Sequence, residues 1–317
     1  MQNNMRAVTQ QEFGGPEVLR VAEVPIPEPL PTEVRVRVVA AGVNPVDHKT
    51  REGGGMAGVL GAPPFILGWD VSGVVEKVGF GVHTLAVGDE VYGMPWFPRQ
   101  AGGYAEYVTA PSRHFARKPA GIGHTAAAAV PLAALTAWQA LTAATTISPG
   151  QRVLVHAAAG GVGHFAVQFA KHLGAHVIGT ARADKHEWLR SLGADELVDY
   201  TTTRFEEVAK DVDVVLDLVG DEDTGVRSVA ALAPGGLLIA VPSGVSPAVS
   251  QAAGQAGVRA IGFLVEPDGP ALAEIAALID AGRVHVEVAG VLPLAEAGEA
   301  HRRLATGRTR GKLVLEI

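Results

Sequence analysis

The chain has 317 residues, of which 48% are hydrophobic and 39 are glycine, a composition typical of soluble globular proteins, and its length predicts two domains at ~150 residues each. Its net charge of −7, without a basic stripe, argues against binding to nucleic acid or to an anionic membrane. The absence of cysteine excludes disulfides, thiolate catalysis and zinc sites with cysteine ligands.

No segment of the sequence has the features of a membrane span or a secretion signal. The first residues, Met1 to Arg6, lack an apolar core. Residues 125–151 carry no charge, but they consist largely of alanine and threonine, and Pro131, Gln139 and Pro149 interrupt them. A spanning helix would need leucine, isoleucine and phenylalanine. We therefore expect a cytoplasmic protein without a membrane anchor.

The first part of the chain has the pattern of short strands separated by turns. Residues 34–39 alternate between valine and other residues as a half-buried strand does, and residues 71–78 and 90–92 are further candidate strands. Glycine and proline clusters, such as residues 14–16 and 53–55, mark the turns. Residues 1–123 are therefore predicted to form a β-rich domain.

The pattern changes near residue 124, where alanine-rich helical stretches lead into repeated strand–helix units. Such units, at this spacing, imply a parallel, doubly wound sheet of the Rossmann type. The predicted strands lie at residues 152–157, 176–180, 196–199, 213–218, 236–241 and 258–263, and the clearest helices lie at residues 163–173 and 185–192.

After Pro267 the sequence predicts a helix at 271–281, a strand at 285–289, a helix at 294–305 and a strand at 312–317. These elements need not extend the parallel sheet, and we expect them to return to the first domain. The predicted organisation is therefore 1–123, 124–265 and 266–317, with the first and last segments forming one domain.

The strongest functional motif lies where a buried strand meets a helix. Residues 153–163 run from apolar residues into Gly160, Gly161, Val162 and Gly163, with Ala158 in place of the usual first glycine. Glycine lets the backbone approach a pyrophosphate, and the helix N-terminus offers unpaired N–H groups to it. The alternative is a tight turn in an α/β domain that binds no cofactor.

The end of the second strand indicates which dinucleotide binds. NAD binders place an acid there to accept a hydrogen bond from the ribose, whereas this strand ends at Thr180 and is followed by Arg182 and Lys185. Both cations would attract a 2′-phosphate, so NADPH is predicted. Asp184 lies between them and opposes this assignment, and the alternative is that both cations are solvated residues at a helix start.

Almost the whole chain resembles the zinc-free quinone oxidoreductase branch of the medium-chain dehydrogenase/reductase superfamily, which includes zeta-crystallin-like and alkenal reductases. The resemblance implies a GroES-like catalytic domain beside the Rossmann domain, and a homodimer. Any one of its motifs alone is weak evidence for the family, but together, in this order along the chain, the motifs are specific for it. They are residues 14–19, 42–47, 87–91, 102–107, 131–141, 158–163 and 311–315.

The resemblance also implies site residues for NADPH. Asn44 is in addition the candidate for a polar contact to the oxygen of the substrate on which charge develops. The alternatives are that Asn44 is a turn residue before Pro45 and that Tyr200 packs at the end of the sheet. The implied contacts are Asn44 and Thr136 near the nicotinamide, Gly160 to Gly163 at the pyrophosphate, Thr180, Arg182, Lys185 and Tyr200 around the adenosine phosphate, and Ser243 and Phe263 on the nicotinamide side.

The departures from related families predict the reaction. Zinc alcohol dehydrogenases of the superfamily carry Gly-His-Glu where this chain carries Gly68-Trp69-Asp70. Enoyl-thioester reductases carry a tyrosine where Gly55 stands, and no tyrosine is followed four residues later by the lysine of short-chain dehydrogenases. We therefore predict reduction of quinones or α,β-unsaturated carbonyls by NADPH, without a metal. The alternatives are an enoyl-thioester or alkenal double-bond reductase, and an NADPH-binding sensor that catalyses nothing.

Overall fold

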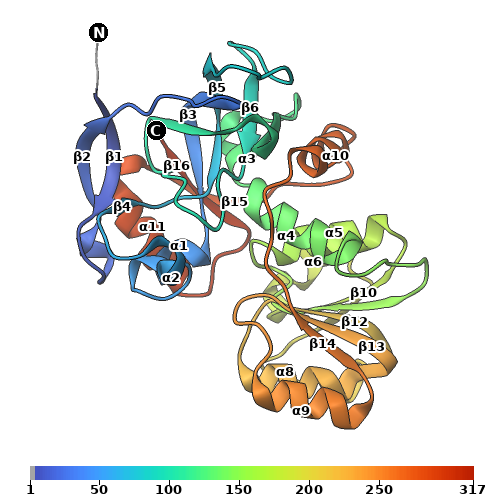
Figure 1. Ribbon diagram of the computed structural model, residues 1–317. Coiled ribbons are helices and arrows are strands. Elements are labelled where there is room, and N and C mark those ends of the chain that lie inside the picture. The colour runs from blue at the N-terminus through green and yellow to red at the C-terminus, as the bar shows by residue number, and fades with distance from the viewer. Residues whose placement is uncertain (1–3) are drawn as a thin grey trace. The chain divides into compact units, whose positions relative to one another are not determined.

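The computed structural model describes residues 4–317 and divides into two compact units (Figure 1). The first unit runs to Leu135 and resumes at Glu266–Gly282 and Val286–Ile317. The second comprises Thr136–Val265 together with Arg283–His285. No helix in the described part of the chain is long and apolar enough to cross a membrane.

The second unit contains a six-stranded sheet in which every neighbouring pair is parallel. Its order places the first strand at the centre, and the chain then moves outward in both directions, which is the doubly wound arrangement that the sequence predicted. The strands, in spatial order, are β11 (Glu196–Val198), β10 (His176–Thr180), β9 (Arg152–Val155), β12 (Val212–Asp217), β13 (Leu232–Ala240) and β14 (Arg259–Gly262).

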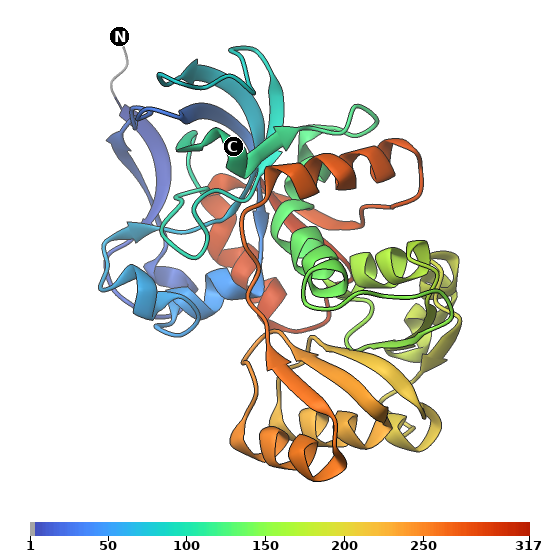
Figure 2. The same ribbon diagram turned by 45° about the vertical axis from the view of Figure 1, so that its right-hand side comes forward.

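Helices cover both faces of this sheet. Helix α5 packs against β9 and β10, while α8 packs against β12 and β13 and α9 packs against β14. Figures 1 and 2 show α8 and α9 on the face opposite α5. The helices of the unit are α5 (Gly163–His172), α6 (His186–Ser191), α7 (Phe205–Val208), α8 (Glu222–Ala231) and α9 (Pro247–Ala256), with a short 3-10 turn η3 at Ala183–Lys185.

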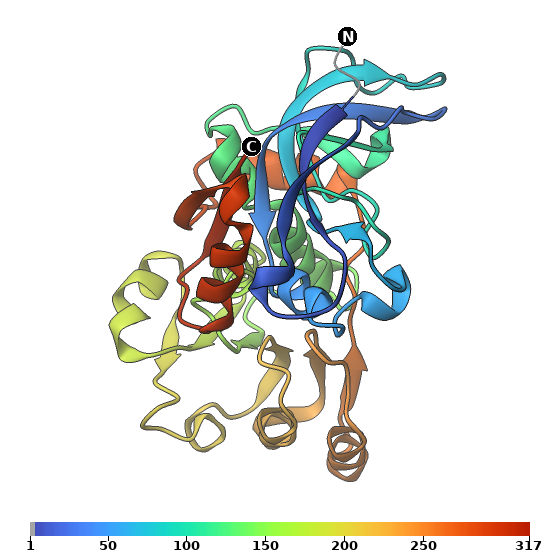
Figure 3. The same cartoon turned by 90° about the vertical axis from the view of Figure 1, so that its left-hand side faces the viewer.

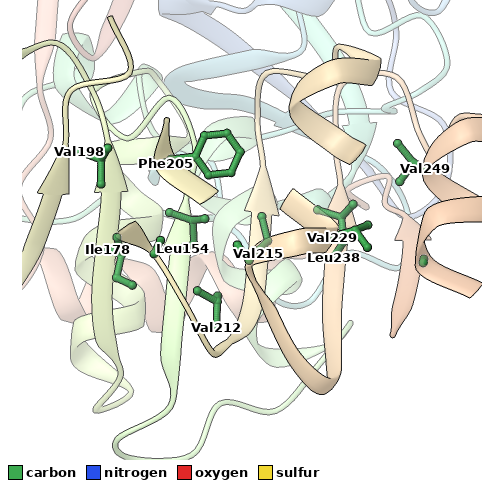
Figure 4. Close-up of a cluster of buried hydrophobic side chains, with 12 residues drawn as sticks. Leu154, Ile178, Val198, Phe205, Val212, Val215, Val229, Leu238 and Val249 are labelled. Atoms are coloured by element: carbon green, nitrogen blue, oxygen red, sulfur yellow. The ribbon is translucent and has the colours of Figure 1, made fainter. Parts of the chain in front are cut away.

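The core of the second unit lies between the sheet and helices α7, α8 and α9 (Figure 4). Leu154, Ile178 and Val215 are fully buried on three neighbouring strands, and Val229 and Val249 face them from α8 and α9. Burying one such side chain contributes about 1.5–3 kcal/mol. This layer of apolar contacts fixes the strand ends that carry the predicted cofactor site.

The first unit is built around the long strand β3 (Glu33–Val43), which pairs antiparallel with β5, β7 and β16. Because β16 follows β3 by more than two hundred residues, the two ends of the chain meet in one sheet, and Figure 3 shows the red C-terminal elements beside the blue N-terminal strands. The remaining strands are β5 (Asp70–Val78), β6 (Glu90–Gly93), β7 (Tyr107–Pro111), β8 (Phe115–Arg117), β15 (Val288–Pro293) and β16 (Lys312–Glu316), and a second sheet has the order β2 (Arg20–Pro25), β1 (Asn4–Gln10), β4 (Phe65–Ile66).

Short helices surround the sheets of the first unit. Helix α1 packs against α11, and α10 packs against β8. Asn44 is the N-cap residue of α1, and its N–H donates to the Asp47 side chain at 2.6 Å, as in one half of a capping box. The helices are α1 (Pro45–Arg51), α2 (Ala57–Leu60), α3 (His124–Ala128), α10 (Gly269–Asp280) and α11 (Ala297–Ala305), with 3-10 turns η1 (Pro16–Val18), η2 (Ser112–His114) and η4 (Leu294–Glu296). Helix α4 (Pro131–Thr142) belongs to both units, because the boundary between Leu135 and Thr136 falls within it.

Most of the predicted elements are confirmed, and one strand is wrong. The strand expected at residues 285–289 is instead β15, Val288–Pro293, because its parallel pairing with β16 sets its position and includes an irregularity at Gly290. Strands β1 and β2 were not predicted individually, since the sequence pattern before residue 34 gave only the turns, and helix α1 was not predicted within the β-rich segment.

Candidate functional site

The predicted pyrophosphate loop follows β9 and leads into helix α5. The Gly160 N–H donates to the Ala157 carbonyl at 2.9 Å, which closes a tight turn. A Cβ atom on Gly163 would lie 2.3 Å from the Ala157 carbonyl oxygen and 2.7 Å from the Ala158 Cα. Only glycine therefore lets α5 start this close to the end of β9, which is the role of the third glycine in dinucleotide-binding loops.

The start of α5 suits an anion. The helix has ten residues, and the first N–H groups of a helix have no partner within it and carry its positive dipole end. Gly160, Gly161 and Val162 are half-buried and directly precede the helix. The loop is thus a backbone cradle that fits the pyrophosphate of NADPH.

The predicted 2′-phosphate residues come together only in part. Arg182 follows β10 and Tyr200 follows β11, and the Arg182 Nε donates to the Tyr200 hydroxyl at 3.3 Å. Tyr200 is 53% exposed as a residue, so it does not pack into the core. Lys185 pairs instead with Asp184, at 2.7 Å between Nζ and Oδ2. Two cations and one phenol therefore lie near the end of β10, with one carboxylate beside them.

Thr180, the last residue of β10, is 3% exposed. Its hydroxyl lies 3.1 Å from His156 Nδ1 and accepts from the Ala157 N–H at 3.3 Å. The hydroxyl is therefore held behind the pyrophosphate loop by protein groups, whereas the family resemblance places Thr180 at the adenosine phosphate.

The residues predicted for the nicotinamide side follow the ends of two adjacent strands. Ser243 is exposed after β13, and the half-buried Phe263 follows β14, where its N–H donates to the Ala240 carbonyl at 2.9 Å. A Cβ on Gly220, which follows β12, would lie 3.1 Å from Ser243 Oγ. Ligands of doubly wound sheets bind at this carboxyl edge. Thr136, on α4, is 2% exposed.

Asn44 belongs to the first unit and lies in a buried polar cluster. Its Nδ2 donates to Asp70 Oδ2 at 2.8 Å, and its Oδ1 accepts from Lys312 Nζ. The Lys312 ammonium also donates to the Val43 carbonyl at 3.1 Å. Because Lys312 begins β16 and Asp70 begins β5, strands from distant parts of the sequence fix the orientation of the Asn44 amide.

A second series of buried groups reaches the same helix start from the other side. Arg51 donates to His301 Nδ1 at 3.1 Å, so the proton of that imidazole lies on Nε2, which is 3.2 Å from the Tyr104 hydroxyl. Tyr104 in turn donates to Asp47 Oδ2 at 3.0 Å. Burial raises the pKa of Asp47 to about 7, and burial together with the Arg51 charge lowers the pKa of His301 to about 3.

Sequence reasoning missed the residues that surround Asn44. The family motifs include Asp47, Tyr104 and Lys312, but the motifs alone assign them no role. The available signal was their chemistry, because a charged residue next to an apolar strand, such as Lys312 before residues 313–315, is rarely buried unless it is paired.

Trp69 occupies the position at which zinc enzymes of the superfamily carry histidine. Its indole N–H donates to the Arg99 carbonyl at 2.7 Å, and its ring packs edge-on against Phe97 at 5.5 Å. Among residues 4–317 no group of three or more histidine, aspartate or glutamate side chains is arranged to hold a metal ion. The side chain at this position is therefore a packing group.

Comparison with known proteins gives two family matches. Residues 30–120 match the family described as alcohol dehydrogenase GroES-like domain, and residues 192–315 match the family described as zinc-binding dehydrogenase. The chain is 36% identical to the NADPH-dependent alkenal/one oxidoreductase of Arabidopsis thaliana, over 98% of this chain and 79% of that protein.

Two solved structures have the same fold over nearly their whole length. The quinone oxidoreductase of Coxiella burnetii has a TM-score of 0.93 and 37% identity, covering 99% of both chains. The Escherichia coli quinone oxidoreductase complexed with NADPH has a TM-score of 0.87 and 31% identity, covering 98% of this chain and 100% of that one.

Proposed function

The chain belongs to the zinc-free quinone oxidoreductase branch of the medium-chain dehydrogenase/reductase superfamily, and on that premise we propose that it is an NADPH-dependent reductase of quinones and α,β-unsaturated carbonyl compounds. The observation that carries the proposal is the glycine cradle between β9 and α5. Beside it, Arg182, which follows β10, contacts Tyr200, which follows β11. When bound, NADPH supplies the hydride, and the protein supplies orientation and electrostatics.

The proposed roles in cofactor binding follow from position. The N–H groups at Gly161, Val162 and Gly163 bind the pyrophosphate. Arg182, Lys185 and Tyr200 bind the 2′-phosphate, and the Lys185 ammonium exchanges its contact with Asp184 for the phosphate. Ser243, Phe263 and Thr136 orient the nicotinamide.

We propose Asn44 as the polar contact for the substrate oxygen on which negative charge develops. Its amide has two N–H hydrogens, of which one is used by Asp70, and the second serves the substrate. Lys312 holds the Oδ1 side of the amide, so the N–H side keeps a fixed direction. Such preorganised donors stabilise charge because they need no reorganisation during the reaction.

The choice of substrate class follows from charge. Oxidation of an alcohol requires a stabilised alkoxide, which zinc or a tyrosine–lysine pair provides in other dehydrogenases. This chain has neither set of residues. Trp69 replaces the histidine ligand of zinc, and no tyrosine is followed four residues later by lysine. A quinone or enone spreads the added charge over its own conjugated system and needs less stabilisation from the protein.

An acceptor panel tests this function. We expect NADPH-dependent reduction of 9,10-phenanthrenequinone, 1,4-benzoquinone or an alkenal, and little oxidation of ethanol or benzyl alcohol. Fast alcohol oxidation without quinone or enone turnover would refute the proposal. Preference for crotonyl thioester would favour an enoyl-thioester reductase, and tight NADPH binding with no acceptor reduced would favour a sensor.

The same proposal assigns the parts of the chain. Residues 124–265 are assigned to the NADPH-binding domain, although residues 124–135, which include α3, belong to the first compact unit. The segments before and after them form the GroES-like catalytic domain, as the pairing of β16 with β3 supports. A homodimer in the cytoplasm completes the proposal. Strand β14 lies at the edge of its sheet and Leu264 just after it is 53% exposed, which suits pairing with a second copy. Sedimentation velocity and cell fractionation test these assignments.

A further inference from the structure

A buried histidine lies directly behind the pyrophosphate loop. His156 follows β9, is 1% exposed, and has protein partners on both ring nitrogens. Its Nδ1 lies 3.1 Å from the Thr180 hydroxyl, and its Nε2 lies 2.9 Å from the Ser228 hydroxyl on α8. The ring thus joins the first two strands of the sheet to a helix that covers it.

The partners of His156 determine where its proton lies. The Ser228 hydroxyl donates to the Thr224 carbonyl at 2.7 Å, so it accepts from the imidazole, and the proton lies on Nε2. The bare Nδ1 then accepts from the Thr180 hydroxyl. Burial lowers the pKa of His156 to about 4, so the ring is neutral at physiological pH. Every donor in this series therefore points the same way.

The series ends on the backbone of the loop. The Thr180 oxygen accepts from the Ala157 N–H at 3.3 Å. Ala157 has a φ of 47°, which is unfavourable for a residue with a side chain, so it needs contacts that hold it. The Ala157 carbonyl accepts from the Gly160 N–H and is the atom against which Gly163 packs. A shift of Ala157 would therefore move both glycines of the cradle.

We propose that His156 is a positioning residue for NADPH, which acts through Thr180 to hold the strained Ala157 and hence the pyrophosphate cradle. This inference rests on the proposed function, since it concerns binding of the same cofactor. His156 does not touch the cofactor in this role. It sets cofactor affinity by keeping the loop in its binding conformation before NADPH arrives.

Removal of hydroxyl groups from the series tests the proposal. Ser228→Ala leaves the His156 Nε2–H without its acceptor, and Thr180→Val removes the group that links His156 to Ala157. We expect the Kd for NADPH to rise about fivefold in Ser228→Ala, as for one lost hydrogen bond, and about tenfold or more in Thr180→Val. Thr180→Ser, which retains the hydroxyl, should restore the Kd to within about twofold of the parent value.

Ser72→Ala is the matched control. Like Ser228, Ser72 is fully buried and its hydroxyl contacts one backbone carbonyl, that of Val91, and one histidine nitrogen, His124 Nδ1. It lies in the first unit, away from the loop in the sequence. Ser72→Ala should lower the melting temperature about as much as Ser228→Ala and leave the Kd for NADPH unchanged.

The binding measurement is titration of NADPH followed by its fluorescence, with calorimetry as a second method and the KM values for NADPH and quinone measured beside it. A Kd within twofold of the parent in both Ser228→Ala and Thr180→Val would overturn the inference, and so would an equal loss of affinity in Ser72→Ala. If Thr180→Val does not fold, Ser228→Ala decides alone. Failure of the unmodified protein to bind NADPH would instead refute the proposed function.

The tautomer provides a readout that does not require NADPH. Nitrogen-15 NMR of the histidine side chains should show His156 with a protonated Nε2 and a bare Nδ1, and the Nε2 proton should exchange slowly because it is buried. In Ser228→Ala this proton should exchange faster. A protonated Nδ1 in the unmodified protein would contradict the proposed direction of the hydrogen bonds.

Discussion

Lys312 Nζ lies 3.3 Å from Asp70 Oδ2, and the two side chains are 3% and 0% exposed. Burying these two charges costs desolvation free energy, which is offset because the Asn44 oxygen and the Val43 carbonyl also accept from the ammonium. Two residues that stand 242 positions apart therefore fix the environment of Asn44.

Replacement of Lys312 by methionine should destabilise the protein strongly. The Asp70 carboxylate would remain buried without its cation, at a cost of about 3–5 kcal/mol. Lys77→Met is the control, because Lys77 and Glu28 form an exposed pair, 51% and 65% accessible, and exposed ion pairs contribute little to stability. Urea unfolding monitored by tryptophan fluorescence measures both variants. Equal losses in the two would contradict a structural role for the buried pair.

Arg182→Ala and Lys185→Ala should weaken NADPH far more than NADH. A charged hydrogen bond to the 2′-phosphate is worth about 1.5–3 kcal/mol, and NADH lacks this phosphate. Arg190→Ala, at an exposed position of helix α6 near Lys185, is the control and should change neither affinity. Titration of each variant with both cofactors measures the effect. Equal affinity of the unmodified protein for NADPH and NADH would argue against recognition of the 2′-phosphate.

Buried histidines should make the protein less stable in acid. The pKa of His156 is lowered to about 4 by burial and then by the Arg227 charge, with Asp221 and Glu206 acting in the opposite direction, whereas the unfolded value is 6.5. Below pH 6.5 the unfolded chain takes up a proton that the folded protein does not, so this stability is lost as the pH falls from 6.5 through 4. His301 adds to the same trend.

Asp47 should act in the opposite direction. Its pKa is raised from 3.8 to about 7 by burial, with Asp70 adding to the rise and the Asn44 N–H, Tyr104 and Lys312 opposing it, so its contribution is lost as the pH rises from 3.8 through 7. Asp47→Asn removes this contribution, and the free energy of unfolding should then increase more steeply with pH, by at most about 1.4 kcal/mol per unit.

Urea unfolding between pH 4.5 and 7 measures this difference in slope. Asp89→Asn is the control, because hydrogen bonds from the Ala86 N–H and Arg117 lower the pKa of Asp89 and keep it ionised over this range. Parallel profiles for the parent and Asp47→Asn would show that Asp47 is ionised in the folded protein.

The purified, untagged protein should contain far less than one equivalent of zinc, and chelators should leave its activity intact. The chain has no cysteine. Trp69 stands at the position of a histidine ligand, and its indole N–H donates to the Arg99 carbonyl. Elemental analysis by mass spectrometry provides the measurement. Stoichiometric zinc bound through histidines would overturn this expectation, whatever the description of the matching dehydrogenase family.

Local patterns predicted the strands of the second unit well, because most of them are short runs of apolar residues that a turn or a helix follows. The loop at Gly160–Gly163 followed from the same local pattern. The surroundings of Asn44 could not be predicted in this way, since Lys312 and Asp70 reach it only through the pairing of β16 and β5 with β3. The position of β15 was wrong for the same reason, because a distant strand sets it.

The Thr180 assignment shows a second limit. The sequence placed this residue correctly at the end of a strand, next to the cations of the predicted phosphate site. It could not show which way the hydroxyl points, because that depends on His156, 24 residues earlier. The family motif therefore located the residue, while its hydrogen-bonding partners required the three-dimensional structure.

The pairing of β16 with β3 also determines when the first unit can be finished during synthesis. Translation proceeds from the N-terminus, so residues 136–265 leave the ribosome as one continuous segment and can fold while residues 40–43 of β3 still lack their partner β16. The nascent chain then displays an unpaired apolar strand edge until residues 312–316 emerge. Ribosome-bound chains stalled before this point should bind chaperones through the first unit and release them once β16 is added.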